Sequence, residues 1–365
     1  MDCDVLVVGS GLTGATIARL AKDRGASVIM VERRGHIGGN VHDRRHHSGI
    51  VVHTYGPHYF RTSSDRLFKF VNRFSAFRPF AATLKTLVDG RYENWPISAE
   101  YIERAIGVDW RPEFIGEPTN FEEACLGMMP RVVYDRFVKG YTEKQWGVPA
   151  ASLDAALAGR FDVRADNDPR LKKSRYQGLP VDGYASFMSR MLAGIPVILN
   201  YDYLRQRTEI VARRLTVYTG AIDEFFEFDL GRLRYRGQRR EEIWFAEAGH
   251  RHPTVQTNFP GMAQGGFIRE IEWKHMMDSA DFRDISGTLI TREYPVTPEH
   301  PDRFEYPFPS ARDHGLFERY RQRAAAIPNL LICGRLGEYR YYDMDQAIAR
   351  AFVLFDRVVK PEIER

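Results

Sequence analysis

Residues Asp4–Glu32 read DVLVVGSGLTGATIARLAKDRGASVIMVE, and this stretch decides the first part of the fold. The opening apolar run has the length of a buried strand, and a helical period follows the glycines. A second apolar strand ends at Glu32, which completes a β-α-β unit. Gly9, Gly11 and Gly14 occupy the turn between strand and helix as G-x-G-x-x-G. The stretch therefore predicts a Rossmann-type dinucleotide-binding unit.

A bound dinucleotide explains each residue of this turn. Gly9 permits the tight turn, Gly11 lets the backbone approach a pyrophosphate, and Gly14 lets helix and strand pack closely. The helix begins beside Leu12, so its N-terminus faces the phosphates. Glu32 can accept hydrogen bonds from ribose hydroxyls, and its charge disfavours a 2′-phosphate.

Two further features favour FAD over NAD. The segment that follows Glu32 contains a second glycine pair, Gly38-Gly39, beside Asn40 and close to Arg33. Near the C-terminus, GRLGEYRYYDMDQAI (Gly334–Ile348) predicts a turn and a helix start that could face the flavin. NAD sites rarely need such a distal return of the chain, so we predict FAD.

Composition narrows the class of protein. The net charge of +4 is too small to indicate nucleic-acid binding, although it suits an anionic substrate where cations converge. The sequence lacks an apolar run of the ~18 residues that a membrane helix needs. Three cysteines without metal-ligand spacing predict a reducing compartment, no disulfide framework and no metal. The acidic start predicts no signal peptide. We expect a cytoplasmic protein that binds neither nucleic acid nor membranes.

The pattern along the chain predicts an α/β fold with a discontinuous Rossmann-type FAD domain. That domain is expected to comprise residues 1–65, 195–235 and 325–365. Residues 66–147 are predicted to form a mainly helical inserted domain. Residues 148–194 and 236–324 are predicted to form an antiparallel β-sheet domain that holds the substrate.

Four sequence blocks resemble the UDP-galactopyranose mutase family. They are HTYGPHYFRT (His53–Thr62), YTEKQWG (Tyr141–Gly147), FIREIEWKH (Phe267–His275) and Gly334–Ile348, and they are spread over nearly the whole chain. The last block is long and unusual, and YTEKQW is nearly as specific.

The resemblance implies a flavin-dependent mutase, an isomerase that interconverts the pyranose and furanose forms of a UDP-sugar. In this family reduced FAD attacks the anomeric carbon through N5 as UDP departs, and the reaction is redox-neutral. UDP-galactopyranose is the expected substrate, and its furanose is expected to serve cell-surface polysaccharide biosynthesis. An external reductant such as NAD(P)H and a homodimer are the other implied partners.

The same resemblance assigns roles to individual residues. The implied catalytic residues are Arg160, Arg269 and His58, with nearby Arg164 as an alternative to Arg160. The predicted cofactor site comprises Gly9, Gly11, Leu12, Gly14, Glu32, Arg33, Gly39, Asn40, Gly56, Pro57, His58, Tyr59, Arg335, Tyr342, Asp343, Met344, Asp345, Gln346 and Ala347. The predicted substrate site comprises Arg61, Asn94, Tyr141, Thr142, Trp146, Arg160, Leu171, Asn258, Arg269, Tyr306 and Tyr341.

Departures from the family cluster on the substrate side. Arg61 stands where members usually have His, and Leu171 stands where a Tyr often contacts substrate. Arginine is longer than histidine and permanently charged, so it could reach an acetamido carbonyl. UDP-N-acetylgalactosamine or another nucleotide sugar is therefore an alternative substrate.

Two other classes of protein remain open from the sequence. A flavin amine oxidase or desaturase shares the fold and the N-terminal glycine motif, but it would need an apolar cavity without diphosphate-binding arginines. The second class is a flavin-binding protein that senses nucleotide sugars without converting them. Only one feature favours it: Leu171 replaces the tyrosine that often contacts substrate in the family.

Overall fold

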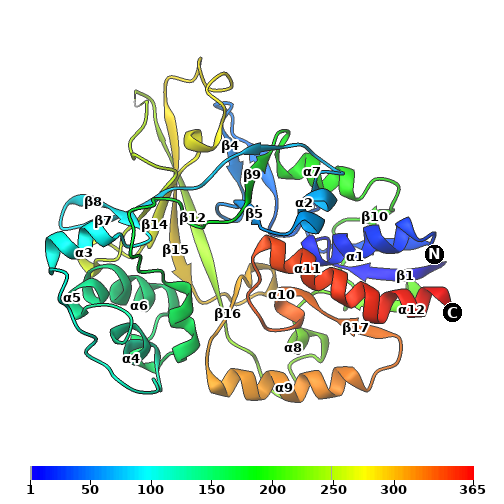
Figure 1. The fold of residues 1–365 in the computed structure, drawn as a ribbon. Coiled ribbons are helices and arrows are strands. Elements are labelled where there is room, and N and C mark those ends of the chain that lie inside the picture. Colours follow the sequence, from blue (N-terminus) through cyan, green and yellow to red (C-terminus); the bar gives the residue numbers. More distant parts are fainter. Residues whose placement is uncertain (1, 248) are drawn as a thin grey trace.

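The computed structural model describes residues 2–247 and 249–365, and it is a mixed α/β structure with several sheets. This confirms the predicted fold class. Figure 1 shows a sheet-and-helix layer that holds both termini, a long twisted sheet beside it, and a group of short helices beyond that sheet. Within the described residues no helix is both long and apolar enough to cross a membrane.

A five-stranded parallel sheet forms the Rossmann-type layer. Its strand order is β10-β2-β1-β11-β17. The strands are β1 (Asp2–Val8), β2 (Val28–Val31), β10 (Val197–Ile198), β11 (Val211–Tyr218) and β17 (Leu330–Ile332). Helix α1 (Leu12–Asp23) packs against α11 (Met344–Leu354), so a helix from near the C-terminus covers the N-terminal unit (Figure 1). Apolar residues such as Val5, Val7, Ile17 and Ile348 are completely buried there.

A seven-stranded sheet provides the second layer, in the order β16-β12-β15-β14-β13-β7-β8. The strands are β7 (Leu84–Val88), β8 (Arg91–Trp95), β12 (Tyr235–Phe245), β13 (Gln256–Asn258), β14 (Arg269–Glu272), β15 (Thr288–Val296) and β16 (Tyr306–Pro307). Neighbouring strands are antiparallel except for β13 and β7, which run parallel. Two small sheets complete the strands: β3 (Asp43–Arg45) with β4 (Val51–His53), and β5 (Phe60–Thr62)-β9 (Tyr176–Pro180)-β6 (Phe77–Pro79).

Short helices between β8 and β9 pack around a separate aromatic core. They are α3 (Ala99–Ala105), α4 (Phe121–Leu126), α5 (Arg131–Val133), a π-helical turn (Tyr134–Lys139) and α6 (Gly140–Trp146). Phe121, Tyr134 and Phe137 are buried inside this group. The other helices are α2 (Asp65–Val71), α7 (Gly183–Met191), α8 (Ile222–Phe225), α9 (Ala311–Ala325), α10 (Gly334–Gly337), a π-helical turn (Phe355–Val359) and α12 (Lys360–Glu364).

The division into domains stays a prediction, and two contacts cross its boundaries. Residues 66–147 contain several helices, as expected of a mainly helical domain, but they also contain β6, β7 and β8, and β7 pairs with β13 of the large sheet. Helix α7 was assigned with the substrate domain, yet it contacts α1 and buries Phe187 and Met188 in the core of the Rossmann-type layer. An amphipathic helix needs an apolar partner, and its own sequence does not say which layer supplies one.

Candidate active site

A cofactor groove of about 220 Å³ runs along the strand-to-helix turn of the first unit. Gly9, Gly11, Leu12, Gly14, Glu32, Arg33, Gly39, Asn40, His58, Arg335, Tyr342, Met344 and Ala347 are the predicted cofactor residues that line it. They come from both ends of the chain, which meet because α11 packs on α1.

Two glycines of the motif have different structural roles. A Cβ atom on Gly14 would lie 2.2 Å from the carbonyl oxygen of Gly9, so only glycine allows this close approach of helix and turn. A Cβ on Gly11 would meet no atom within 4 Å, because it would project into open space. Gly11 thus leaves room beside the helix N-terminus for a phosphate-sized group.

The carboxylate of Glu32 is fixed at the end of β2. Its Oε2 accepts hydrogen bonds from the backbone N–H and the hydroxyl of Ser10, at 2.8 and 2.6 Å. Its Oε1 accepts a hydrogen bond from the backbone N–H of Arg34 at 2.9 Å. The arrangement holds a charged acceptor at the position where a dinucleotide carries its ribose.

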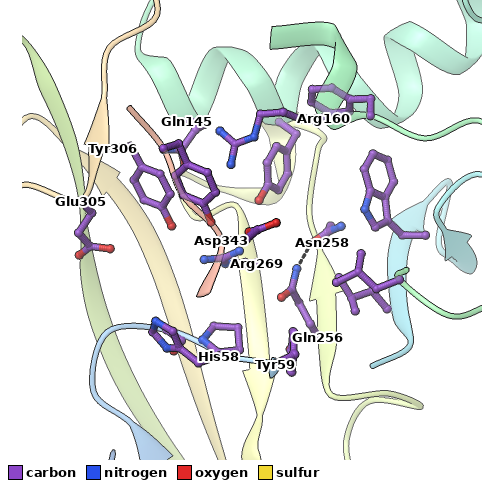
Figure 2. A pocket seen from close by; sticks show the side chains of 18 of the residues that line it. His58, Tyr59, Gln145, Arg160, Gln256, Asn258, Arg269, Glu305, Tyr306 and Asp343 are labelled. Atoms are coloured by element: carbon purple, nitrogen blue, oxygen red, sulfur yellow. Dashed lines mark hydrogen bonds between the residues drawn. The ribbon is translucent and has the colours of Figure 1, made fainter. Parts of the chain in front are cut away.

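A second cavity of about 290 Å³ continues from this groove (Figure 2). Asn40, His58, Arg335 and Met344 line both spaces, so they mark the junction between them. The other predicted residues that line the second cavity are Gly56, Pro57, Tyr59, Arg61, Tyr141, Thr142, Trp146, Arg160, Leu171, Asn258, Arg269, Tyr306, Tyr341, Asp343 and Asp345.

A row of cross-strand partners brings Arg269 to the cavity. Strand pairing sets Asn258 opposite Arg269, Arg269 opposite Glu293, and Glu293 opposite Arg240. Directly opposite side chains in a sheet are neighbours, so these four residues meet although the chain separates them widely. The Nε of Arg269 donates to Glu293 at 2.5 Å, and the Nε of Arg240 donates to the other oxygen of Glu293 at 2.9 Å.

This network keeps the buried charges ionised. Burial alone would raise the pKa of Glu293, but the guanidiniums of Arg269 and Arg240 outweigh it, and that pKa lies below its ordinary value. Arg240 also donates two hydrogen bonds of 2.8 Å to Glu305, which lines the cavity. Arg269 therefore faces the cavity as a fixed cation, held from behind by a paired carboxylate (Figure 2).

Arg160 contributes a second positive charge, from the side of the cavity opposite Arg269. It ends a 3₁₀ turn, Ala155–Arg160, and Figure 2 shows its side chain reaching into the cavity. Its guanidinium lies 4.3 Å from the ring centre of Tyr341, which stacks with Tyr306 at 5.8 Å. In the described part of the chain Arg160 has no carboxylate partner, so its charge is available to a ligand.

Arg164, the alternative to Arg160, lies outside the lining of this cavity. Its side chain pairs with Asp162 at 3.1 Å and donates to the backbone carbonyl of Asp168 at 2.7 Å. These contacts tie together the segment that follows the 3₁₀ turn. The structure therefore separates a cavity-lining arginine from a structural one.

Tyr141, Thr142 and Trp146 lie on α6, and they line the end of the cavity that adjoins the helical group. Trp146 is also a core residue, because its ring packs edge-on against Phe308 at 5.5 Å. Among the described residues, Thr142 Oγ1 and Gln145 Nε2 are buried without a hydrogen-bond partner. Buried polar atoms are seldom left unpaired, so these two are available to a polar ligand.

His58 stands where the groove meets the cavity, and it is neutral. Burial lowers its pKa to about 3, with smaller contributions from His53 and Arg335. Its Nδ1 lies 2.7 Å from the carbonyl oxygen of Gly56, an acceptor that requires the proton to be on Nδ1. Nε2 therefore carries a lone pair and can only accept a hydrogen bond.

The burial of His53 and His58 makes the free energy of unfolding depend on pH. Burial also lowers the pKa of His53 to about 3, whereas an unfolded histidine titrates near 6.5. The unfolded chain then binds more protons, so the free energy of unfolding falls as pH drops from about 6.5 toward 3.

Urea unfolding at pH 7 and pH 5 tests this dependence with a His53→Gln variant. Glutamine can still accept the hydrogen bond that the backbone N–H of His58 donates to His53 Nδ1 at 3.0 Å. The wild type is expected to lose more stability between the two pH values, by up to about 1.4 kcal/mol per pH unit. Equal losses in both proteins would show that His53 does not carry the effect.

Arg61 lines the cavity but is held by a carboxylate. Its Nη2 donates to Asp343 at 2.9 Å. Asp343 also caps α11, in a capping box with Gln346. Leu171 lines the cavity as well, and its backbone N–H donates to the carbonyl of Ala82, just before β7.

Two predicted residues lie outside both cavities among the described residues. Asn94 was expected to bind substrate, but it accepts a hydrogen bond of 2.6 Å from Lys85 on the neighbouring strand. Gln346 was expected to bind the cofactor, but its side-chain oxygen accepts from the Asp343 backbone N–H at 3.0 Å. The two side chains are thus occupied by local strand and helix-cap contacts.

Other lining residues were missed by the sequence analysis. Gln145, Gln256 and Glu305 line the second cavity, and Gln256 donates to Asn258 at 2.8 Å (Figure 2). Tyr201 and Tyr218 line the far end of the groove. Gln145 could have been found, because it lies one helical turn after Tyr141 in the YTEKQW block.

Comparison with known proteins places this chain in a family. Residues 136–341 match the model described as UDP-galactopyranose mutase, and residues 7–74 match an NAD(P)-binding Rossmann-like domain. A probable UDP-galactopyranose mutase of Klebsiella pneumoniae is 30% identical over 97% of this chain and 94% of its own length. A dTDP-fucopyranose mutase of Escherichia coli is 29% identical over 95% of this chain and 96% of its own length.

A solved structure gives the same result for the fold. The crystal structure of a reduced UDP-galactopyranose mutase superimposes with a TM-score of 0.75 at 15% identity, over 98% of this chain and 96% of that one. The chain belongs to the UDP-galactopyranose mutase family, and it is an enzyme of the isomerase class.

Proposed function

We propose that the protein interconverts UDP-galactopyranose and UDP-galactofuranose with reduced FAD as its cofactor. One observation carries this proposal: the cofactor groove opens at His58 and Arg335 into a cavity that presents Arg160 and Arg269. A cofactor in the groove would then meet a substrate whose diphosphate is held by those arginines. Related proteins named as UDP-galactopyranose mutases support the choice of sugar.

FAD fits the residues of the groove. The open space at Gly11 beside the N-terminus of α1 suits the pyrophosphate, and the Glu32 carboxylate suits ribose hydroxyls. The N-terminus of α11, at Met344, lies at the junction with the second cavity, where it can donate to the flavin end. When bound and reduced, FAD supplies a nucleophilic nitrogen at the anomeric carbon of the sugar.

The arginines of the cavity match the charge that develops on the leaving group. As the bond between the sugar and the diphosphate breaks, UDP gains negative charge. Arg269 is already fixed by Glu293 and needs no reorientation, so its N–H groups stabilise that charge from the start. Arg160 adds a cation without a carboxylate partner among the described residues. The hydroxyls of Tyr306 and Tyr341 supply further donors.

His58 acts on the cofactor side as a neutral acceptor. Its Nδ1 proton is engaged by Gly56, so Nε2 can accept a hydrogen bond but cannot repel a cationic sugar centre. The buried Thr142 and Gln145 atoms without protein partners are suited to the uracil base, whose edge carries both donors and acceptors. NAD(P)H or a similar donor would keep the cofactor reduced.

Product analysis separates this function from an oxidase. A mutase converts the nucleotide sugar into an isomer of equal mass and consumes no O₂ with substrate. An amine oxidase or desaturase would consume O₂ or another electron acceptor, and its substrate cavity would not need arginines. Oxygen uptake that depends on substrate would contradict the proposal.

A second candidate substrate is a nucleotide sugar with a different substituent. The similarity to a dTDP-fucopyranose mutase leaves the sugar and the nucleotide open. Arg61 and Leu171 are two of the positions where the sequence differs from what the resemblance leads us to expect, and both line the cavity. If Arg61 leaves Asp343 when substrate binds, its guanidinium can donate to an acetamido carbonyl.

The Arg61→His variant tests this choice. We expect the ratio of kcat/KM for UDP-galactose and UDP-N-acetylgalactosamine to shift about tenfold toward UDP-galactose, because a charged hydrogen bond contributes about 1.5–3 kcal/mol. An Asp343→Asn variant is the matched control, since it weakens the pair seen at 2.9 Å and leaves Arg61 in place. If kcat/KM for the two substrates changes by the same factor in Arg61→His, the arginine has only a structural role.

A further inference from the structure

His250, Glu272 and His275 gather on the face of the large sheet that lies away from the cavity. Side chains alternate along a strand, so Glu272 points away from the side on which Arg269 of the same strand lines the cavity. His250 lies in the connection between β12 and β13, and His275 lies in the 3₁₀ turn Trp273–Met276 that follows β14. No step of the proposed reaction uses these residues.

The Glu272 carboxylate is held rigidly at the centre of the cluster. It is completely buried, and its oxygens accept hydrogen bonds from the backbone N–H groups of Arg251 and His252 and from the hydroxyl of Thr288, at 2.6–3.1 Å. Such outer contacts orient a carboxylate ligand and leave it little freedom.

Each of the two imidazoles has a nitrogen close to a different oxygen of the Glu272 carboxylate. Nδ1 of His250 lies 3.6 Å from Glu272 Oε1, and Nε2 of His275 lies 3.4 Å from Glu272 Oε2. Zinc bonds of 2.0–2.2 Å in a tetrahedron require ligand atoms separated by about 3.3–3.6 Å. The two imidazoles stack with ring centres 4.3 Å apart, and the three ligand atoms lie within 4.8 Å of one another.

From this geometry we propose that His250, Glu272 and His275 bind a zinc ion. The side chains of His250 and His275 are 38% and 22% exposed, so the ion can enter from solvent and keep a water as its fourth ligand. Zinc would replace the proton that His275 Nε2 now shares with the carbonyl oxygen of His252 at 2.8 Å. Lys274 does not compete for the site, because its ammonium donates to the carbonyls of Ile285 and Gly287.

The composition of the cluster explains why the sequence did not predict a metal. Cysteine spacing was the criterion, and these ligands are two histidines and a glutamate, with His250 on a different segment from Glu272 and His275. His250 and Glu272 come together only because β13 and β14 are adjacent antiparallel strands. Bound zinc would tie the connection before β13 to the turn after β14, and would stabilise this end of the sheet.

The test uses the tag-free, FAD-containing full chain, first treated with EDTA and then titrated with zinc chloride. We expect one equivalent of zinc to remain after desalting and the melting temperature to rise with zinc. His250→Ala, which removes the most exposed ligand, should weaken zinc binding by about 100-fold or more. Glu272→Gln should also lose binding.

His314→Ala is the matched control, because His314 is an exposed histidine on α9, away from the cluster. This variant should bind zinc as the wild type does. The proposal is overturned if the wild type retains no stoichiometric zinc, or if His250→Ala retains it with unchanged affinity. His250→Ala keeps the result interpretable even if Glu272→Gln does not fold.

Discussion

Arg269→Ala is expected to lower kcat by about 10²–10³ while the protein still binds FAD. The side chain faces the cavity from β14, and its removal takes away charge-assisted donors from the departing diphosphate. Donors of this kind contribute about 2.7–4 kcal/mol to transition-state stabilisation. Single-turnover rates of the reduced variant measure the effect apart from product release. Glu293 keeps Arg240 as a partner at 2.9 Å, so the vacated carboxylate does not stand alone.

Arg164→Ala is the matched control for the arginines. Arg160→Ala should lose turnover to a similar extent, whereas Arg164, which pairs with Asp162 outside the cavity lining, should matter much less for kcat. Near-wild-type rates in both Arg269→Ala and Arg160→Ala would contradict the assignment of the diphosphate site.

Gly11→Val is expected to leave a folded protein without flavin. A Cβ at Gly11 meets no protein atom within 4 Å, so the side chain begins in open space, and we expect its methyl groups to occupy the space of the pyrophosphate. The purified variant should lack the yellow absorption bands of oxidised flavin, and heating the wild type should release FAD rather than FMN. The wild type should also show a higher melting temperature than the variant when FAD is added.

Gly14→Val provides the comparison for Gly11→Val. Its Cβ would lie 2.2 Å from the Gly9 carbonyl oxygen, so this variant should fold poorly whether or not FAD is present. Normal flavin content in Gly11→Val would place the cofactor elsewhere.

The parts of the fold that the sequence predicted are those set by local interactions. The strand, glycine turn and helix of residues 4–32 follow one another directly, and each has its own period or turn chemistry. The turn and helix start within residues Gly334–Ile348 were predicted for the same reason, and the helix is α11. Most of the site residues that were predicted from the family blocks line the two connected cavities.

The parts that were missed depend on contacts between distant segments. Nothing local indicates that β7 pairs with β13, or that Glu293 lies between Arg269 and Arg240. Register alone sets that row of side chains. Cross-strand pairing also places Asn94, whose side-chain oxygen accepts a hydrogen bond from Lys85 on the neighbouring strand.

The central claim is that the redox state of the bound flavin controls a redox-neutral isomerisation. The direct measurement is chromatographic separation of pyranose and furanose forms after the dithionite-reduced protein is incubated with a panel of nucleotide sugars that includes UDP-galactose. We predict that the reduced protein equilibrates UDP-galactopyranose and UDP-galactofuranose, and that the oxidised protein does so at a negligible rate. Equal rates in both redox states, or no furanose from any sugar of the panel, would contradict it.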